Sequence, residues 1–154
     1  MLRPSTGMIA ACAGVVGAIA VVLCRPSAGV TRSGLEGAVA PTFANLVHLQ
    51  RSILGLPAEP ASALRAAARC QKVGATKETD GPGDWTCTVN WYSGWAQLHD
   101  GYDVTVTADG CYTATADGAE AHIGGPTLTG RDGTTVTNLL YTFEGCFDTR
   151  RTTR

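Results

Sequence analysis

The sequence predicts an α+β domain in which an N-terminal signal or anchor helix and two short helices precede an antiparallel sheet of about four strands. Apolar residues recur at helical spacing between positions 41 and 69, and at a period of two after position 84. Asp-Gly pairs, which are typical of tight turns, stand only in the second half, at 80–81, 100–101, 109–110, 117–118 and 132–133. This order indicates a meander with the helices on one sheet face.

The N-terminal segment has the order of an export signal. Arg3 precedes sixteen residues, Met8 to Leu23, that contain neither a charge nor a proline. This length lies between a signal core of about 7–15 residues and a membrane-spanning helix of about 20. Residues 1–24 are therefore a signal or a membrane anchor. We favour an uncleaved anchor over a cleaved signal, and both over a lipid-modified Cys24.

Composition divides the rest of the chain into a linker, a domain and a tail. Residues 25–40 are rich in Gly, Ser and Ala and are interpreted as a linker, residues 41–148 as the domain, and residues 149–154 as a basic, solvated tail. From Pro41 onward there are nine Lys/Arg and twelve Asp/Glu, a net charge of −3. With no basic stripe to neutralise phosphates, we expect no nucleic-acid partner.

Two helices are expected at the start of the domain. Thr42 is the predicted N-cap of the first, and Gly55 and Pro57 end it. The second runs from about Pro60 to Cys70 through an alanine-rich stretch of strong helix formers. The apolar face of the first helix comprises Phe43, Leu46, Val47, Ile53 and Leu54.

Four strands are expected after the helices. Residues 85–91 and 102–107 alternate between apolar and polar side chains, as half-buried strands do. Asp109 and Gly110 predict a two-residue hairpin turn, after which 111–116 returns as the third strand. Val136 to Phe143 is the predicted fourth strand.

Four of the six cysteines lie in the domain, and an even number in an exported domain is typical of a disulfide framework. Three pairings are possible. We favour Cys70–Cys87, from the end of a helix to the first strand, and Cys111–Cys146, from the middle of the sheet to the C-terminal segment. No Cys-x-x-Cys zinc pattern is present.

No motif for catalysis, metal or cofactor binding stands out. His48, His99 and His122 lie far apart in the sequence, and none belongs to a metal or protease motif. The aspartates lack EF-hand spacing, and each is explained by a turn. We therefore predict a non-enzymatic protein without a metal or cofactor.

The aromatic stretch from Trp85 to Trp95 holds the candidate binding residues. Trp85 and Trp91 share the strand face assigned to the core. Trp95 lies beyond that strand, in the loop-like sequence Ser-Gly-Trp-Ala, where recognition residues tend to stand. Trp95 is the best candidate for an exposed contact, and Tyr92 is expected to join it.

Several short stretches resemble a group of small actinobacterial exported proteins of unknown function. They are Pro41-Thr42-Phe43 with Leu49-Gln50, Cys70, Gly83-Asp84-Trp85-Thr86-Cys87, Tyr102-Asp103-Val104, Asp109-Gly110-Cys111-Tyr112 and Phe143-Glu144-Gly145-Cys146-Phe147-Asp148. The resemblance spans roughly residues 41–148. It implies an exported domain with two bridges and names neither an activity nor a ligand.

Three hypotheses for function follow. We favour an extracytoplasmic domain that binds a protein or another envelope component, either attached to the membrane by its N-terminal segment or secreted if that segment is cleaved. The alternative is an accessory subunit of a membrane complex such as an ABC transporter, with Ala10, Gly14 and Ala18 as a helix-contact face. A further alternative is a secreted hydrolase or enzyme inhibitor.

Overall fold

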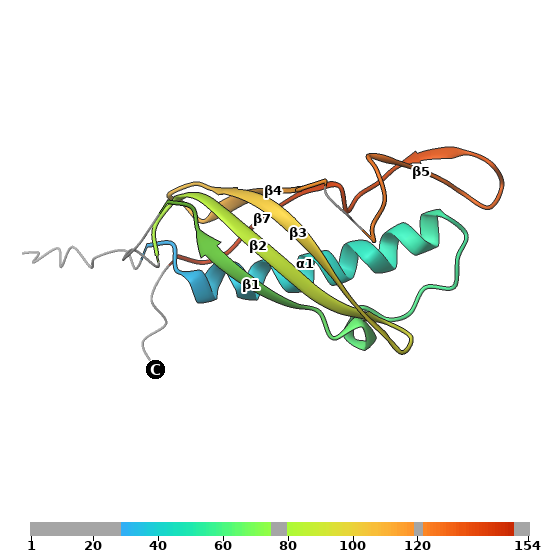
Figure 1. Cartoon of the computed structure of the whole chain (residues 1–154), viewed down its shortest axis with the longest axis horizontal. Helices are drawn as coiled ribbons and strands as arrows, with labels where there is room; N and C mark the ends of the chain where they lie inside the picture. Colours follow the sequence, from blue (N-terminus) through green and yellow to red (C-terminus); the bar gives the residue numbers. More distant parts are fainter. Residues whose placement is uncertain (1–28, 75–79, 119–121, 150–154) are drawn as a thin grey trace, which may run out of the picture.

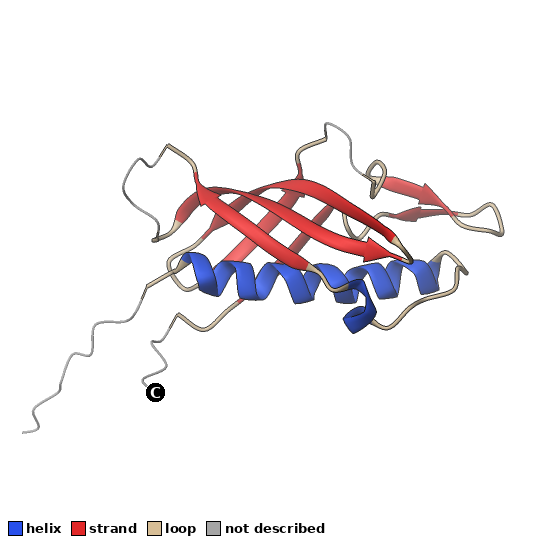
Figure 2. Ribbon diagram, turned by 60° about the horizontal axis from the view of Figure 1, so that its bottom comes forward, coloured by secondary structure: helices blue, strands red, loops and turns tan. Residues whose placement is uncertain are grey.

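The computed structural model describes residues 29–74, 80–118 and 122–149. One long helix lies along one face of a five-stranded antiparallel sheet, and a small two-stranded sheet extends beyond one end of it (Figures 1 and 2). The α+β class is confirmed. Among the described residues, no helix is long and apolar enough to cross a membrane. The predicted signal or anchor, residues 1–24, lies outside the described residues.

Helix α1 (Arg32–Ile53) begins well before the predicted position. Thr31, and not Thr42, is its N-cap, because the Thr31 side chain accepts a hydrogen bond from the amide of Gly34 at 3.1 Å. The linker predicted over residues 25–40 is therefore wrong from Arg32 onward.

The early part of α1 was missed because its apolar pattern is thin. Leu35 and Val39 continue the buried four-residue spacing of Phe43 and Val47, but the residues between them are small or polar. A proline is typical of a helix boundary, whereas Pro41 lies inside α1 on its exposed side. On that side its ring does not intrude into the core, although the helix still loses one backbone hydrogen bond and the ring crowds the carbonyl of Gly37.

The second predicted helix is wrong. Only Ala61–Leu64 is helical, as one 3-10 turn (η1), and Ala67–Lys72 forms strand β1. Strand β1 pairs antiparallel with β2 (Gly83–Ser93) along its whole length. Alanine favours a helix by less than about 1 kcal/mol per residue, so cross-strand pairing and a disulfide outweigh that preference.

The main sheet has the order β1-β2-β3-β4-β7, with every neighbouring pair antiparallel. It therefore has five strands where about four were predicted. The strands not yet given are β3 (Ala96–Val106), β4 (Cys111–Ala116) and β7 (Thr142–Cys146).

The two faces of the sheet differ as the alternation predicts. The face toward α1 carries the core, in which the Phe43 ring lies 5.6 Å from Trp91 and 6.2 Å from Tyr102 between ring centroids. The opposite face is polar and rich in threonine. The buried strand residues include Trp85, Val89, Trp91, Tyr102, Val104, Ala114 and Phe143.

The turn at Asp109–Gly110 is not the two-residue type I′ turn that an Asp-Gly pair predicts. Four residues, 107–110, join β3 to β4, and Gly110 alone of them has a positive φ, of 86°. A type I′ turn needs positive φ at two successive residues. Glycine is required here, because a Cβ at position 110 would lie 2.6 Å from the carbonyl oxygen of Phe147.

The fourth predicted strand, Val136 to Phe143, is two separate elements. Its first residues belong to β6 (Thr135–Thr137), which pairs with β5 (Thr127–Thr129), while β7 begins only at Thr142. The buried Asn138 separates them. Its amide donates to the carbonyls of Ile123 and Gly125 at 2.8 Å, and its side-chain oxygen accepts from the amide of Leu140 at 3.0 Å.

Both favoured disulfide pairs are confirmed. Cys70–Cys87 joins β1 to β2, and Cys111–Cys146 joins β4 to β7, each between residues that are directly opposite in the register. The prediction that Cys70 stands at the end of a helix is wrong, because Cys70 lies within strand β1.

Candidate recognition site at the hairpin tip

The tip of the β2–β3 hairpin presents a fully exposed tryptophan. Ser93 and Ala96 are the last paired residues, so Gly94 and Trp95 form the two-residue turn. Gly94 has φ 59° and Trp95 does not have a positive φ, a combination typical of a type II′ turn with glycine first. Trp95 has a relative exposure of 102%, which confirms the prediction that it is exposed.

Tyr92 and Arg65 lie beside this turn. The guanidinium carbon of Arg65 is 5.9 Å from the centre of the Tyr92 ring, within the range of a cation–π contact. A hollow of about 150 Å³ lies there, lined by Ala63, Arg65, Tyr92, Gly94 and Trp95. The structure thus brings both predicted binding residues to one place.

Arg65 has an unusual backbone conformation. Its φ of 46° and ψ of 39° lie in the left-handed region, and it is the only described residue other than glycine with a positive φ. That conformation costs roughly 1–2 kcal/mol for a residue with a Cβ. Within the described residues, its guanidinium contacts the Tyr92 ring but makes no hydrogen bond or ion pair. Sequence reasoning missed Arg65 because it placed the residue in a regular helix.

A shallow groove adjoins the tip hollow. It has a volume of about 280 Å³ and lies between α1 and η1, and Arg65 lines both it and the tip hollow. Most of its other lining is apolar and small: Ala40, Pro41, Ala44, Ala61 and Ala66, with Asn45 and Ser62 as the polar exceptions. Because Arg65 lines both, we consider the tip hollow and the groove together and call them the tip surface.

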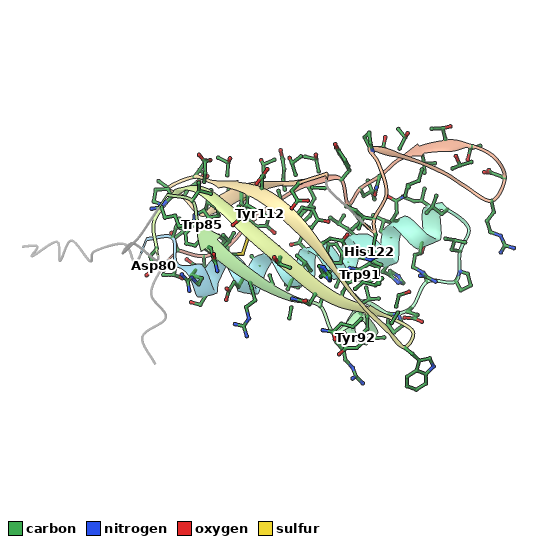
Figure 3. The ribbon with its side chains drawn as sticks, viewed as in Figure 1. Asp80, Trp85, Trp91, Tyr92, Tyr112 and His122 are labelled. Carbon is green, nitrogen blue, oxygen red and sulfur yellow. A yellow bond between two sulfur atoms is a disulfide. The ribbon has the colours of Figure 1, made fainter. Side chains whose placement is uncertain are left out.

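None of the three histidines lines the tip surface. The ring nitrogen Nδ1 of His48 is 2.8 Å from the carbonyl oxygen of Glu59, and the rings of His99 and His122 are 5.8 Å apart. Buried Asp100 accepts hydrogen bonds from Trp91 Nε1 at 2.8 Å and from the His122 amide at 2.7 Å; Figure 3 shows Trp91 and His122 close together. Sequence reasoning had not placed His122 beside Asp100.

The ionisable groups with shifted pKa values also lie elsewhere. Burial, and then the charges of Asp100 and Asp117, raise the pKa of Tyr102, and burial raises that of Tyr112. Hydrogen bonds from threonine hydroxyls lower the pKa values of Asp109 and Asp132. None of these four shifted groups lines the tip surface. Across the described ranges, no group of three or more His, Cys, Asp or Glu residues could hold a metal ion.

The two disulfides indicate an oxidising, extracytoplasmic environment. The chain matches no protein-family model, no curated protein and no solved structure.

Proposed function

We propose that this chain is a non-enzymatic extracytoplasmic recognition domain that binds a protein partner through the tip surface. The observation that carries the proposal is the complete exposure of Trp95 beside the Tyr92–Arg65 pair. Tryptophan, tyrosine and arginine are the residues most enriched among binding hot spots. Here all three converge on one hairpin tip.

Arg65 gives the expected partner a chemical character. Its planar guanidinium can bind a carboxylate through two parallel hydrogen bonds, and the Tyr92 ring already orients it. The partner should therefore present an acidic side chain next to an apolar one. The acidic group would pair with Arg65, and the apolar group would cover Trp95.

The tip lies at the end of the sheet opposite the start of the described chain (Figure 3). The amide of Gly81 donates to the carbonyl of Val30 at 2.8 Å, which places the start of β2 beside the start of the described chain. Strand β2 then runs for eleven residues, or about 33 Å, toward the tip. Figure 3 shows Asp80 and Tyr92 at opposite ends of the sheet. A domain anchored through residues 8–23 would therefore present the tip outward.

Site-specific photo-crosslinking of the full chain in its native envelope tests the proposal. A photoreactive residue at position 95 should give a discrete protein adduct, and the charge-reversing Arg65→Glu change should abolish it. Val73, which is 56% exposed near the other end of the sheet, is the matched position and should not give that adduct. Lipid adducts at position 95 would contradict a protein partner. The same adducts at positions 95 and 73 would contradict binding through the tip surface.

Once the partner is purified, Arg65→Gly separates binding from folding. Glycine adopts the left-handed conformation without a Cβ penalty, so the free energy of unfolding should stay the same or rise by about 1 kcal/mol. Affinity should nevertheless fall at least tenfold, because the guanidinium is lost. Trp95→Ala should weaken binding by about 30-fold. Unchanged affinity in both variants would reject the tip surface as the binding site.

A further inference from the structure

The second disulfide carries an inference that is independent of the tip surface. Cys70 and Cys87 are both buried between the sheet and α1. Cys111 and Cys146 project from the opposite face, where Cys146 is exposed and Cys111 is half-buried. Exposed disulfides are the ones that exchange with thiols, because the attacking thiolate must reach a sulfur atom.

A hollow surrounds the exposed bridge. It has a volume of about 460 Å³, and the side chains that line it with the two cysteines include Thr105, Thr107, Thr113 and Glu144. This volume is within the range of about 300–1,000 Å³ typical of small-molecule sites. The hollow therefore offers room for a thiol compound to approach the bridge without any opening of the domain.

Strand β7 has other attachments that would survive cleavage of the bridge. Five successive residues pair with β4, and the ring of buried Phe143 lies 5.2 Å from that of Tyr102. Beyond Cys146, Phe147 returns to the first turn of α1, where a Cβ on Gly34 would lie 2.9 Å from its ring. Cleavage should therefore loosen the end of β7 and Phe147 while the sheet stays folded.

We propose that Cys111–Cys146 is a thiol–disulfide exchange site for a low-molecular-weight thiol. The thiolate attacks Sγ of Cys146, the bond between the two cysteines breaks, and Cys111 leaves as a thiolate. The proton lost by the thiol is taken up by Cys111. A second thiol then attacks the mixed disulfide, which releases the oxidised thiol dimer and leaves two cysteine thiols. Two external thiols are oxidised by two electrons in total, and the protein disulfide is reduced.

Graded exposure of the full-length protein to glutathione tests this site, with acid quenching, alkylation and peptide mass spectrometry. In the native protein Cys111 and Cys146 should become labelled at least about 100-fold faster than Cys70 and Cys87. The first adduct should sit on Cys146, with at least about tenfold less on Cys111. In concentrated guanidinium chloride the two bridges should react at similar rates, which is the internal control.

Circular dichroism follows the same samples and should show an unchanged sheet when only the Cys111–Cys146 bridge is open. Equal reduction rates for the two bridges in the native protein would overturn the proposal, because reduction would then proceed through global unfolding. Reaction with a thioredoxin-type protein dithiol but not with glutathione would overturn it as well, since the substrate would then be a protein.

Discussion

The two disulfides share one backbone setting and differ in the face of the sheet that they occupy. The hydrogen bond from Val73 to Asp84 lies three residue pairs from the first bridge, and that from Phe147 to Gly110 lies one pair from the second. Because hydrogen-bonded pairs alternate with non-hydrogen-bonded pairs in an antiparallel ladder, both bridges link residues at non-hydrogen-bonded positions. The Cα atoms are 4.1 Å apart in Cys70–Cys87 and 3.9 Å apart in Cys111–Cys146. Cβ atoms approach most closely at such positions, which explains why both strand pairs accept a bridge.

The difference between the bridges follows from the alternation of side chains along a strand. Cys87 stands two residues from Trp85 and from Val89, so all three face the core. Cys111 is one residue from buried Tyr112 and therefore faces solvent. The same covalent bond is thus a core component in β1–β2 and an accessible surface group in β4–β7. Loop length and burial predict opposite rankings for their contributions to stability.

The loss of unfolding free energy on removal of a disulfide is the largest effect that we expect, and it decides between these two rankings. The chain-entropy model gives about 3 kcal/mol for a loop of 17 residues and about 4 kcal/mol for one of 35. Replacing Cys70 and Cys87 by alanine also leaves a cavity in the core, which adds about 1–2 kcal/mol or more. We expect the Cys70/Cys87 double variant to lose about 5 kcal/mol and the Cys111/Cys146 double variant about 4.

Urea unfolding of the two double variants measures this difference, with the wild type as reference. A larger loss in the Cys111/Cys146 variant would show that loop entropy outweighs burial. Equal denaturant slopes in all three proteins are needed for the comparison, since a changed slope would indicate a different denatured state.

A smaller loss of stability is expected from removing the hydrogen bond beside the buried Cys70–Cys87 bridge. The carboxylate of Glu36 on α1 accepts from the amide of Cys70 at 2.9 Å, on the side of β1 that faces away from β2. Glu36→Ala leaves that amide without its partner and should cost about 1.5–2 kcal/mol, in the range for hydrogen bonds to charged groups.

Glu36→Gln is the matched variant, because it keeps a side-chain oxygen acceptor and should lose less than half as much. Thermal or urea unfolding measures both. A loss in Glu36→Ala below about 0.5 kcal/mol would mean that water replaces the carboxylate at this edge.

The smallest expected effect is a pH dependence near the exposed bridge. Hydrogen bonds from the Thr107 hydroxyl and the Cys111 amide lower the pKa of Asp109 in the folded protein. A carboxyl group whose pKa is lower when folded stabilises the protein above its unfolded pKa of about 3.9, and that contribution is lost as pH falls through the folded pKa.

Wild-type stability should therefore decline below about pH 4, and Asp109→Asn should reduce the slope of that decline. Urea midpoints between pH 2 and 7 measure it. Asp132→Asn should reduce the slope as well, since hydrogen bonds from Thr134 lower the pKa of Asp132 in the β5–β6 connection. Identical slopes in wild type and Asp109→Asn would contradict the assignment.

Much of the sheet and part of the candidate site could be predicted from the sequence. Alternation over residues 85–91 predicted the buried face of β2, and the Gly94–Trp95 turn placed an aromatic side chain in solvent. The site prediction was incomplete because Arg65 and Ala63 reach the tip only when the chain leaves η1 in a left-handed conformation. Nothing in the local pattern around Arg65 signals that conformation.

By itself, the sequence determined the α+β class, the cysteines available for bridging, and which side of β2 and β3 is apolar. These properties depend on local periodicity and residue type, which a strand or helix expresses wherever it is placed. The tertiary structure alone decided that alanine-rich residues 67–72 form a strand, that α1 continues through Pro41, and that Asn138 separates β6 from β7. Each of these depends on partners distant in sequence, whose pairing and burial outweigh local preferences of about 1 kcal/mol or less per residue.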